Sequence, residues 1–522
     1  MSGKDLGPIR KHIQSFDISF HGGKVLEYAE KLGIPEEEIL DFSANLNPLG
    51  SPFDYHEYNL SIEEIAKKAH EKSINYPDNR YLDFKSAAAK FTGFENVKPE
   101  NIIPGNGSTE IIRLIAHCVL EKGDKIIVPY PTFGEYEAQC RIQDVEIIDV
   151  ALDEVMSFSK EEIKEKEAKI LFLCNPNNPD GRLWKREEIL KLAKKCENAK
   201  TLLFVDEAFI ELSDVKQSVA DIAAENDYVF VMRSLTKAFG LPGIRLGFGI
   251  ATKHIADILN VARLTWNLSP YQEMTAVALL SMEGGVNSDF LKKSREYIFE
   301  EGKFLREKIS EIWGFIPGEV NTNYILVDIS QRKFGSSELV ERMANHGVLV
   351  RDCISFKGLK DGYVRVAVRT REENIELINT FKIVIQEWAR DFAKNELKEN
   401  LKNKKGKTGE NGRKTCEYYP CHFEGQDCTF CYCPFYPCND TRTGGCFVEK
   451  TRTKELVWSC IDCYIVHLRE PVDQIMEYLM KDEDTDKMIE CAWNKVMIPI
   501  LEQKDEKQIL AICKEIKKQN EN

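Results

Sequence analysis

The chain has 522 residues, of which 43% are apolar and 30% are charged, and its formal net charge is −14. This length exceeds what one hydrophobic core supports, so several structural units are expected. The net negative charge argues against a nucleic-acid-binding surface that covers the whole protein. The sequence has no signal-peptide pattern and no apolar run long enough to span a membrane, which predicts a cytoplasmic protein without a membrane partner.

Residues 1–50 are interpreted as an N-terminal arm that carries substrate-binding residues. His21-Gly22-Gly23 precede the helical pattern KVLEYAEKLG, and FSANLNPLG, which includes Asn45, follows it. A His-Gly-Gly turn at a helix start offers backbone N–H groups and an imidazole to an anion. The alternative for His21 alone is a solvated loop histidine.

Residues 51–275 are expected to form a large α/β domain. Four apolar runs (DKIIVPY, AKILFLC, KTLLFVD and DYVFVM) are typical of buried strands, and EEILKLAKKCEN has the apolar spacing of a helix. Buried strands that alternate with helices predict a mainly parallel, seven-stranded type of sheet. In such sheets the ligand lies beyond the carboxyl ends of the strands.

Polar side chains follow these strands. Asn178, Asp206 and the turn Ser234-Leu-Thr-Lys237 come directly after three of them, and Arg245 lies further on. The segment PGNGSTE sets Gly107, Ser108 and Thr109 at a helix start, where free N–H groups attract phosphate. An amide, a carboxylate, an amine, a guanidinium and an anion site together suit pyridoxal phosphate (PLP).

The rest of the chain divides by composition. Residues 276–392 predict a smaller α/β domain, expected to have a mixed sheet, with Arg351 and Arg365 on or at the ends of strands. The Lys-rich range 393–414 predicts a solvated linker, 415–470 a Cys-rich module, and 471–522 a helical segment.

The module is interpreted as metal-binding, because clustered cysteines in a reducing compartment are more often ligands than disulfides. It is also too short and polar to fold on a core of its own. Two CxxC pairs can each coordinate one zinc ion, and nine thiols can also coordinate an iron–sulfur cluster or form two separate metal sites. The candidate ligands are Cys416, Cys421, Cys428, Cys431, Cys433, Cys438, Cys446, Cys460 and Cys463. Stability, redox sensing and a second activity all remain open as its role.

Residues 20–390 resemble the fold-type I aminotransferase family, a PLP-dependent class. The resemblance implies that Lys237 is the Schiff-base lysine, that Asp206 partners the ring nitrogen, and that Asn178 partners the ring hydroxyl. It further implies that Phe133 stacks on the ring and that a homodimer forms, with Tyr76 reaching the neighbouring subunit's cofactor phosphate. The implied phosphate cup consists of Gly107, Ser108, Thr109, Ser234 and Arg245.

Two departures from the family pattern are visible. Asp180 stands in the NPTG position usually held by threonine, which brings a carboxylate near the site entrance, and Phe209 stands where many members have a tyrosine that donates to the ring hydroxyl. We therefore expect electronic tuning of the ring to differ from that of a typical transaminase.

HGG, FSANLNPLG and DEAFIEL together are similar to the L-threonine-O-3-phosphate decarboxylase family, close relatives of histidinol-phosphate aminotransferases. The resemblance implies a lyase of cobalamin biosynthesis that releases CO2 and (R)-1-amino-2-propanol phosphate. The implied substrate residues are His21, Gly22, Gly23, Asn45, Asn178, Arg351 and Arg365, and how the two arginines divide carboxylate and phosphate stays open. The alternatives are a histidinol-phosphate-type aminotransferase and a regulatory or binding protein on the same fold.

Overall fold

A computed structural model of the chain describes residues 10, 12–13, 16, 22–403, 419, 421–449, 456–481 and 484–503. It divides into two compact units, Met1–Phe381 and Lys382–Asn522. Within these described ranges no helix is long and apolar enough to cross a membrane.

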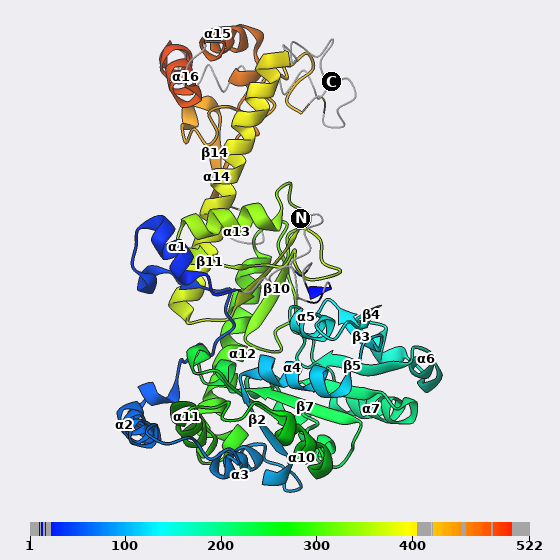
Figure 1. The fold of residues 1–522 in the computed structure, drawn as a ribbon. Helices are drawn as coiled ribbons and strands as arrows, with labels where there is room; N and C mark the ends of the chain where they lie inside the picture. The colour runs from blue at the N-terminus through cyan, green and yellow to red at the C-terminus, as the bar shows by residue number, and fades with distance from the viewer. Residues whose placement is uncertain are drawn as a thin grey trace. The chain divides into compact units, whose positions relative to one another are not determined.

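The first unit is built on a seven-stranded sheet in the order β2-β8-β7-β6-β5-β3-β4 (Figure 1). Its strands are β2 (Ile102–Asn106), β3 (Lys125–Tyr130), β4 (Glu146–Ala151), β5 (Ala168–Cys174), β6 (Leu202–Asp206), β7 (Val229–Ser234) and β8 (Leu246–Ile250). Neighbouring strands are parallel, except that β8 is antiparallel to both β2 and β7. The expected mainly parallel sheet is therefore confirmed.

Both faces of this sheet are covered by helices, as strands with uninterrupted apolar runs predict. Leu203 and Val205 of β6 lie in one hydrophobic core, and Phe204 lies in the other. The first core is shared with α3 (Leu82–Phe91), α7 (Arg186–Ala199), α11 (Pro270–Leu280) and α12 (Asp289–Ser310). The second is shared with α4 (Ser108–Val119), α5 (Glu135–Arg141) and α10 (Lys253–Ala262). Shorter or peripheral helices are α2 (Ile62–Lys72), α6 (Lys160–Glu165), α8 (Ala220–Ala223) and α9 (Leu235–Ala238).

The smaller domain of this unit has a four-stranded sheet, β12-β13-β10-β9, and a separate pair, β1–β11. The strands are β1 (Leu40–Asp41), β9 (Ile316–Pro317), β10 (Tyr324–Asp328), β11 (Val348–Leu349), β12 (Arg351–Asp352) and β13 (Tyr363–Ala367), and the helices are α1 (Val25–Leu32) and α13 (Ser336–Asn345). The expected mixed sheet is wrong, because the four-stranded sheet is antiparallel throughout. The run VLVRD is split: β11 pairs in parallel with β1, and β12 joins the antiparallel sheet.

Helix α14 (Arg371–Asn403) extends into the range 393–414 that we expected to be linker. The stretch KNELKENLKN has no glycine or proline and consists largely of Lys, Glu and Leu, which are strong helix formers. Its scarcity of apolar residues therefore did not indicate the absence of a helix.

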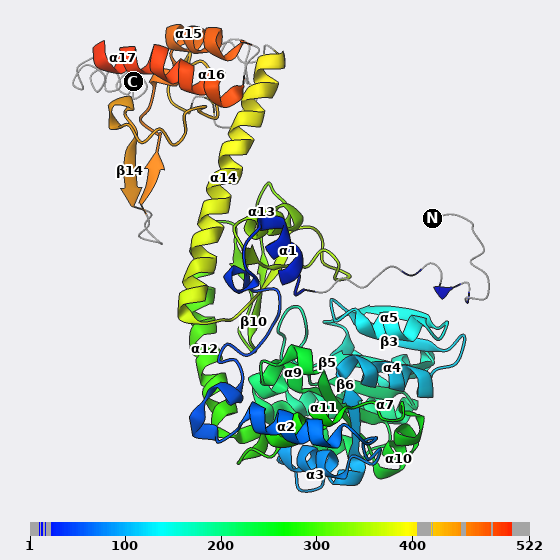
Figure 2. The same cartoon turned by 60° about the vertical axis from the view of Figure 1, so that its left-hand side comes forward.

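The second unit combines the Cys-rich segment with helices that follow it (Figure 2). It contains the antiparallel hairpin β14 (Cys446–Glu449) and β15 (Leu456–Ser459), then α15 (Arg469–Leu479), α16 (Thr485–Ala492), a π-helical turn (Trp493–Met497) and α17 (Ile498–Gln503). Phe430 and Phe435 share a hydrophobic core with Val472 and Ile475 of α15. The Cys-rich segment therefore packs on an apolar core that the C-terminal helices help to build. This core stabilises the segment, whereas the sequence predicted stabilisation by a bound metal alone.

Candidate active site

A cavity of about 320 Å³ lies where β5, β6 and β7 end. The structure brings nearly all the predicted cofactor residues to its wall, namely Ser108, Thr109, Phe133, Asn178, Asp206, Ser234, Lys237 and Arg245. Two predicted cofactor residues, Gly107 and Tyr76, are not part of this wall, although Gly107 lies against Arg245.

One end of the cavity is formed by the start of α4 and by Arg245. Gly107 has a φ of +79°, a backbone conformation that favours glycine, and a Cβ atom there would lie 2.6 Å from Nη2 of Arg245, so a larger residue would also displace that guanidinium. Because Gly107 has no side chain, the guanidinium of Arg245 lies close to the backbone there, beside the free N–H groups at the start of α4. Ser234 and Thr236 add two hydroxyl groups, with their oxygens 2.9 Å apart. This end is suited to a phosphate.

Another part of the cavity wall is formed by Asp206, which is buried at the carboxyl end of β6. Tyr136 of α5 donates a hydrogen bond of 2.5 Å to Oδ2 of Asp206, and the backbone N–H of Ala208 donates to Oδ1 at 2.9 Å. Burial raises the pKa of Asp206 to about 6, whereas the Tyr136 hydroxyl favours the ionised form. Sequence reasoning missed Tyr136; its position three residues after Phe133, one helical turn further on, was the available signal.

Lys237 lies in the short helix α9 and lines the same cavity. Burial, reinforced by the charges of Arg365 and Arg245, lowers the pKa of its amine to about 8. A substantial share of neutral amine is then present near physiological pH, which a nucleophile or a proton-transfer group requires.

The N-terminal segment FSANLNPLG is fastened to the turn that carries Lys237. The backbone N–H of Asn47 donates to the carbonyl of Lys237 at 3.1 Å, and its side-chain amide donates to the carbonyl of Ala238 at 2.7 Å. Gly240 has a φ of +62°, and a Cβ atom there would lie 2.6 Å from the carbonyl oxygen of Gly50. Asn47 was not among the predicted site residues.

Asn45, predicted to bind substrate, lines the cavity and is buried. Its Oδ1 atom has no hydrogen-bond partner among the described residues. An orphaned buried acceptor facing a cavity indicates a position where a ligand donor is expected.

The predicted His-Gly-Gly turn is described in part. His21 lies outside the described residues. The N–H of Gly23 donates to Oγ of Ser43 at 2.9 Å, and a Cβ atom on Gly22 would lie 2.7 Å from the carbonyl oxygen of Ser43. That carbonyl accepts a hydrogen bond of 3.0 Å from Arg365, so the turn lies close to a predicted substrate residue.

A second cavity, of about 410 Å³, adjoins the first and shares Gly22, Phe133, Asn178 and Arg365 with it. Arg351 lines only this outer cavity and donates to Oγ of Ser355 at 2.9 Å. Arg351 and Arg365 are direct partners across the antiparallel strands β12 and β13. Like charges directly opposite each other destabilise a sheet, so this pair favours an anionic ligand between or beside them.

Arg365 is held by neutral partners. It donates through Nη1 to Oδ1 of Asn178, and its guanidinium lies 5.3 Å from the ring centre of Tyr324. Its Nε has no partner among the described residues. Burial lowers the pKa of Arg365, and the charge of Arg351 adds to that effect. This arrangement is suited to accepting a ligand carboxylate or phosphate.

The two departures from the family pattern are now located. The ring of Phe209 lies edge-on to Tyr324, with centres 5.0 Å apart, and the Tyr324 hydroxyl donates to the backbone carbonyl of Asn177. Asp180 accepts hydrogen bonds from the Asn177 amide at 2.8 Å and from the N–H of Arg182 at 3.1 Å. The Asp180 carboxylate therefore accepts hydrogen bonds from its own loop, and Asp180 does not line either cavity.

Comparison with known proteins agrees with this geometry. Residues 37–381 match the family model described as aminotransferase class I and II. The chain belongs to this family. The chain is 32% identical over 380 residues to a histidinol-phosphate aminotransferase of Methanosarcina mazei, covering 72% of this chain and 96% of that one. It is 33% identical over 375 residues to a provisionally named threonine-phosphate decarboxylase of Caldanaerobacter subterraneus, covering 70% and 94%.

Among solved structures, the fold matches a histidinol-phosphate aminotransferase of Sinorhizobium meliloti in complex with pyridoxal-5'-phosphate. The TM-score is 0.62 at 21% identity, covering 73% of this chain and 99% of that chain. At this identity the match supports the fold of the family and not a particular substrate.

Residues 408–490 match a second family model, a cysteine-rich small domain. Cys416 lies outside the described residues. Gln426 donates to the sulfur of Cys421 at 3.0 Å and to that of Cys428 at 3.5 Å. Burial raises the pKa of the Cys433 thiol, and nearby Cys463, Cys460 and Cys438 add to the rise, so these four sulfur atoms lie near one another. The structure nevertheless groups no three Cys, His, Asp or Glu side chains, among those it describes, as the ligands of a metal.

Proposed function

We propose that the chain is a PLP-dependent enzyme that decarboxylates L-threonine O-3-phosphate to (R)-1-amino-2-propanol phosphate and CO2, a step of cobalamin biosynthesis. The observation that carries the proposal is the opposed pair Arg351 and Arg365, of which Arg365 lines the cavity that contains Lys237 and both line the adjoining cavity. Threonine phosphate has one carboxylate and one phosphate, a small number of atoms apart, and therefore matches two adjacent guanidinium groups.

The cavity residues fit PLP. A carboxylate at one end matches the ring nitrogen, and the α4 start with Arg245 and Ser234 matches the phosphate. The amine of Lys237, which lines the same cavity, matches the aldehyde. The Cβ positions of Gly107 and Gly247 are both filled by neighbouring atoms, so this cradle is built by close backbone approach. When bound, PLP supplies an electron sink for the pair released as a bond to the substrate α-carbon breaks.

The two arginines differ in depth, which supports a division of labour. Arg365 lines both cavities and is therefore assigned the carboxylate, which is attached to the reacting carbon. Arg351 lines only the outer cavity and is assigned the phosphate. Holding the phosphate at Arg351 would fix the substrate's orientation, so that Arg365 could hold the carboxylate in the position from which its bond to the α-carbon breaks.

Two further residues are assigned roles in holding and donating protons. Asp206, supported by Tyr136, keeps a proton on the ring nitrogen. As CO2 leaves, the bonding pair stays behind and the α-carbon must accept a proton. Lys237 is the assigned donor, because its Nζ lies in the cavity and its pKa of about 8 leaves a proton available at neutral pH.

Histidinol-phosphate aminotransferase is the second candidate, and it is favoured by the names of several similar relatives. Such an enzyme shares the cofactor residues, and its substrate also has a phosphate. Phe209 argues for the first candidate, since the hydroxyl that many transaminases direct at the ring is absent and the Tyr324 hydroxyl is already bonded to the backbone.

A product assay separates the candidates. The purified protein, loaded with PLP, is incubated with threonine phosphate alone, and CO2 and aminopropanol phosphate are measured. A parallel reaction contains histidinol phosphate and 2-oxoglutarate, and glutamate is measured. Production of CO2 in the first reaction is expected. A keto acid or glutamate without CO2 would instead establish transamination, and Lys237→Ala should abolish both the reaction and the visible absorbance of the bound cofactor.

A homodimer is also proposed, with Tyr76 completing the partner's site. Tyr76 is 78% exposed and stacks on Trp266, with ring centres 4.2 Å apart. Ile74, Val261 and Leu264 are also exposed. Tyr76→Phe is expected to lower cofactor affinity without changing the oligomeric mass; a monomer at micromolar concentration, measured by light scattering, would contradict the proposal.

A further inference from the structure

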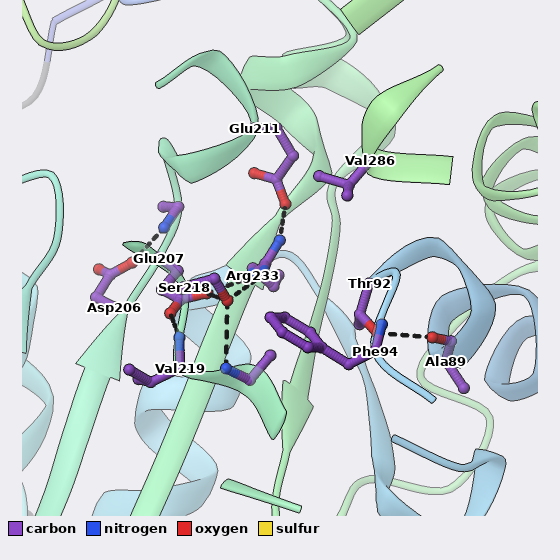
Figure 3. Close-up of polar contacts among 12 residues, drawn as sticks. Ala89, Thr92, Phe94, Asp206, Glu207, Glu211, Ser218, Val219, Arg233 and Val286 are labelled. Atoms are coloured by element: carbon purple, nitrogen blue, oxygen red, sulfur yellow. Dashed lines mark hydrogen bonds and ion pairs between the residues drawn. The ribbon is translucent and has the colours of Figure 1, made fainter. Parts of the chain in front are cut away.

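A buried ion cluster lies behind the cofactor cavity (Figure 3). Arg233 is 1% exposed, and its two acidic partners, Glu207 and Glu211, are fully buried. Nε of Arg233 donates to Glu207 at 2.7 Å, Nη1 donates to Glu211 at 2.5 Å, and Nη2 donates to Oγ of Ser218 at 2.8 Å. The three bonds come from the three different nitrogen atoms of one planar group.

Each charged member of the cluster is a near neighbour, along the chain, of a residue in the cavity wall. Glu207 follows Asp206, Arg233 precedes Ser234, and Glu211 lies two residues after Phe209. Because side chains of a strand alternate between faces, Arg233 points away from the face to which Ser234 contributes. The cluster therefore holds the cavity wall from behind and contributes no atom to either cavity wall.

The cluster joins the end of β7 to the segment that follows β6. At the end of the β6–β7 ladder, the N–H of Glu207 donates to the carbonyl of Met232 at 2.9 Å. Beyond that point the chain leaves the sheet in two directions, one toward Phe209 and the other toward Lys237. Arg233, near the end of β7, bonds to Glu207 and Glu211, which both lie on the segment that follows β6, and so links the two segments. Glu207 also accepts a hydrogen bond of 2.8 Å from the backbone N–H of Val219.

Stability alone does not account for such a cluster. Burying three charges carries a desolvation cost that their attraction often fails to exceed, and apolar side chains of similar volume commonly stabilise a protein as well or better. What a planar, three-way donor provides is a fixed geometry between the groups that it joins.

We propose that Arg233 is a positioning residue, which sets the spacing between Asp206, Phe209 and the Ser234–Lys237 turn from behind the cofactor cavity. The proposal rests on the proposed function only in that PLP occupies this cavity; it does not depend on which reaction follows.

The test compares Arg233→Lys with Arg371→Lys. Arg371 makes a similar forked ion pair, with Glu301 at 2.8 to 3.0 Å, in the smaller domain and outside both cavity walls. Three quantities are measured for each protein: the melting temperature, the dissociation constant of PLP from absorbance titration, and the position of the visible absorption band of bound PLP.

Arg233→Lys is expected to raise the PLP dissociation constant about tenfold and to move the absorption band, because a lysine replaces three directed bonds with a single flexible ammonium. Arg371→Lys, at a side chain that is 40% exposed, should lower the melting temperature less than Arg233→Lys does and leave both cofactor readouts unchanged. If Arg233→Lys binds PLP with wild-type affinity and an unchanged band, the positioning role is overturned.

A second variant keeps the proposal testable if Arg233→Lys does not fold. Glu211→Gln preserves shape and one acceptor, and it is expected to move the absorption band by loosening the turn that carries Phe209. A wild-type band and affinity in Glu211→Gln would also overturn the proposal. Failure of the wild-type protein to bind PLP would instead refute the proposed function itself.

Discussion

The burial of Lys237 makes a quantitative prediction about the cofactor-free protein. Burial is the main reason that the pKa of its amine falls from 10.5 to about 8. Folding therefore penalises the charged amine, and a shift of this size corresponds to about 3 kcal/mol. Below pH 8 the amine is charged in both folded and unfolded chains, and the full penalty is present. Between pH 8 and 10.5 the unfolded chain holds the proton that the folded chain has lost, so the free energy of unfolding rises with pH.

Lys237→Met removes this penalty. The cofactor-free variant should be about 3 kcal/mol more stable than the wild type at pH 7, and the difference should fall to about half at pH 9.5. Urea unfolding followed by circular dichroism, at one fixed protein concentration, measures it. Lys169→Met, an exposed position on β5, is the matched control and should show no pH-dependent difference. A difference that is the same at both pH values would refute the assignment of the penalty to the Lys237 charge.

Three further outcomes are expected. Tyr136→Phe removes a charge-assisted hydrogen bond from Asp206, so PLP affinity, measured by absorbance titration, should fall about tenfold; unchanged affinity would show that the bond is dispensable. Phe209→Tyr restores a hydroxyl beside the ring, and it should shift the visible band of bound PLP and increase keto-acid formation from threonine phosphate; an identical spectrum would contradict the tuning argument. If the module binds metal, Cys460→Ser combined with Cys463→Ser should lower the zinc or iron content of the full-length protein as measured by mass spectrometry, whereas Cys118→Ser should not; equal metal content in all three proteins would exclude this pair as ligands.

The sheet and most of the cavity wall follow from the sequence because both depend on local patterns. Uninterrupted apolar runs mark buried parallel strands, and the first polar residues after each run fall at one edge of the sheet. Asp206 and Lys237 were therefore predictable without knowing the strand order.

The supporting residues were not predictable in this way, since their roles depend on contacts between distant segments. Tyr136 lies 70 positions before Asp206. Asn47 contacts Lys237 and Ala238 although about 190 residues separate them. Arg233 interrupts an apolar strand with a charge whose partners are identified only once β6 and β7 are adjacent.

The segment from Phe42 to Asn47 has a further consequence for how the length of this chain can vary. At Phe42 the backbone is bonded on both sides to the smaller domain, through Leu349 and Ala367, and at Asn47 it is bonded to the carbonyl of Lys237. Five residues span this distance, and an extended chain covers at most about 3.5 Å per residue. The segment is thus a tether of fixed reach between the arginine-bearing domain and the lysine, so a deletion within it would draw the two anchors closer together or break one of them, and an insertion would lengthen the tether without changing either anchor.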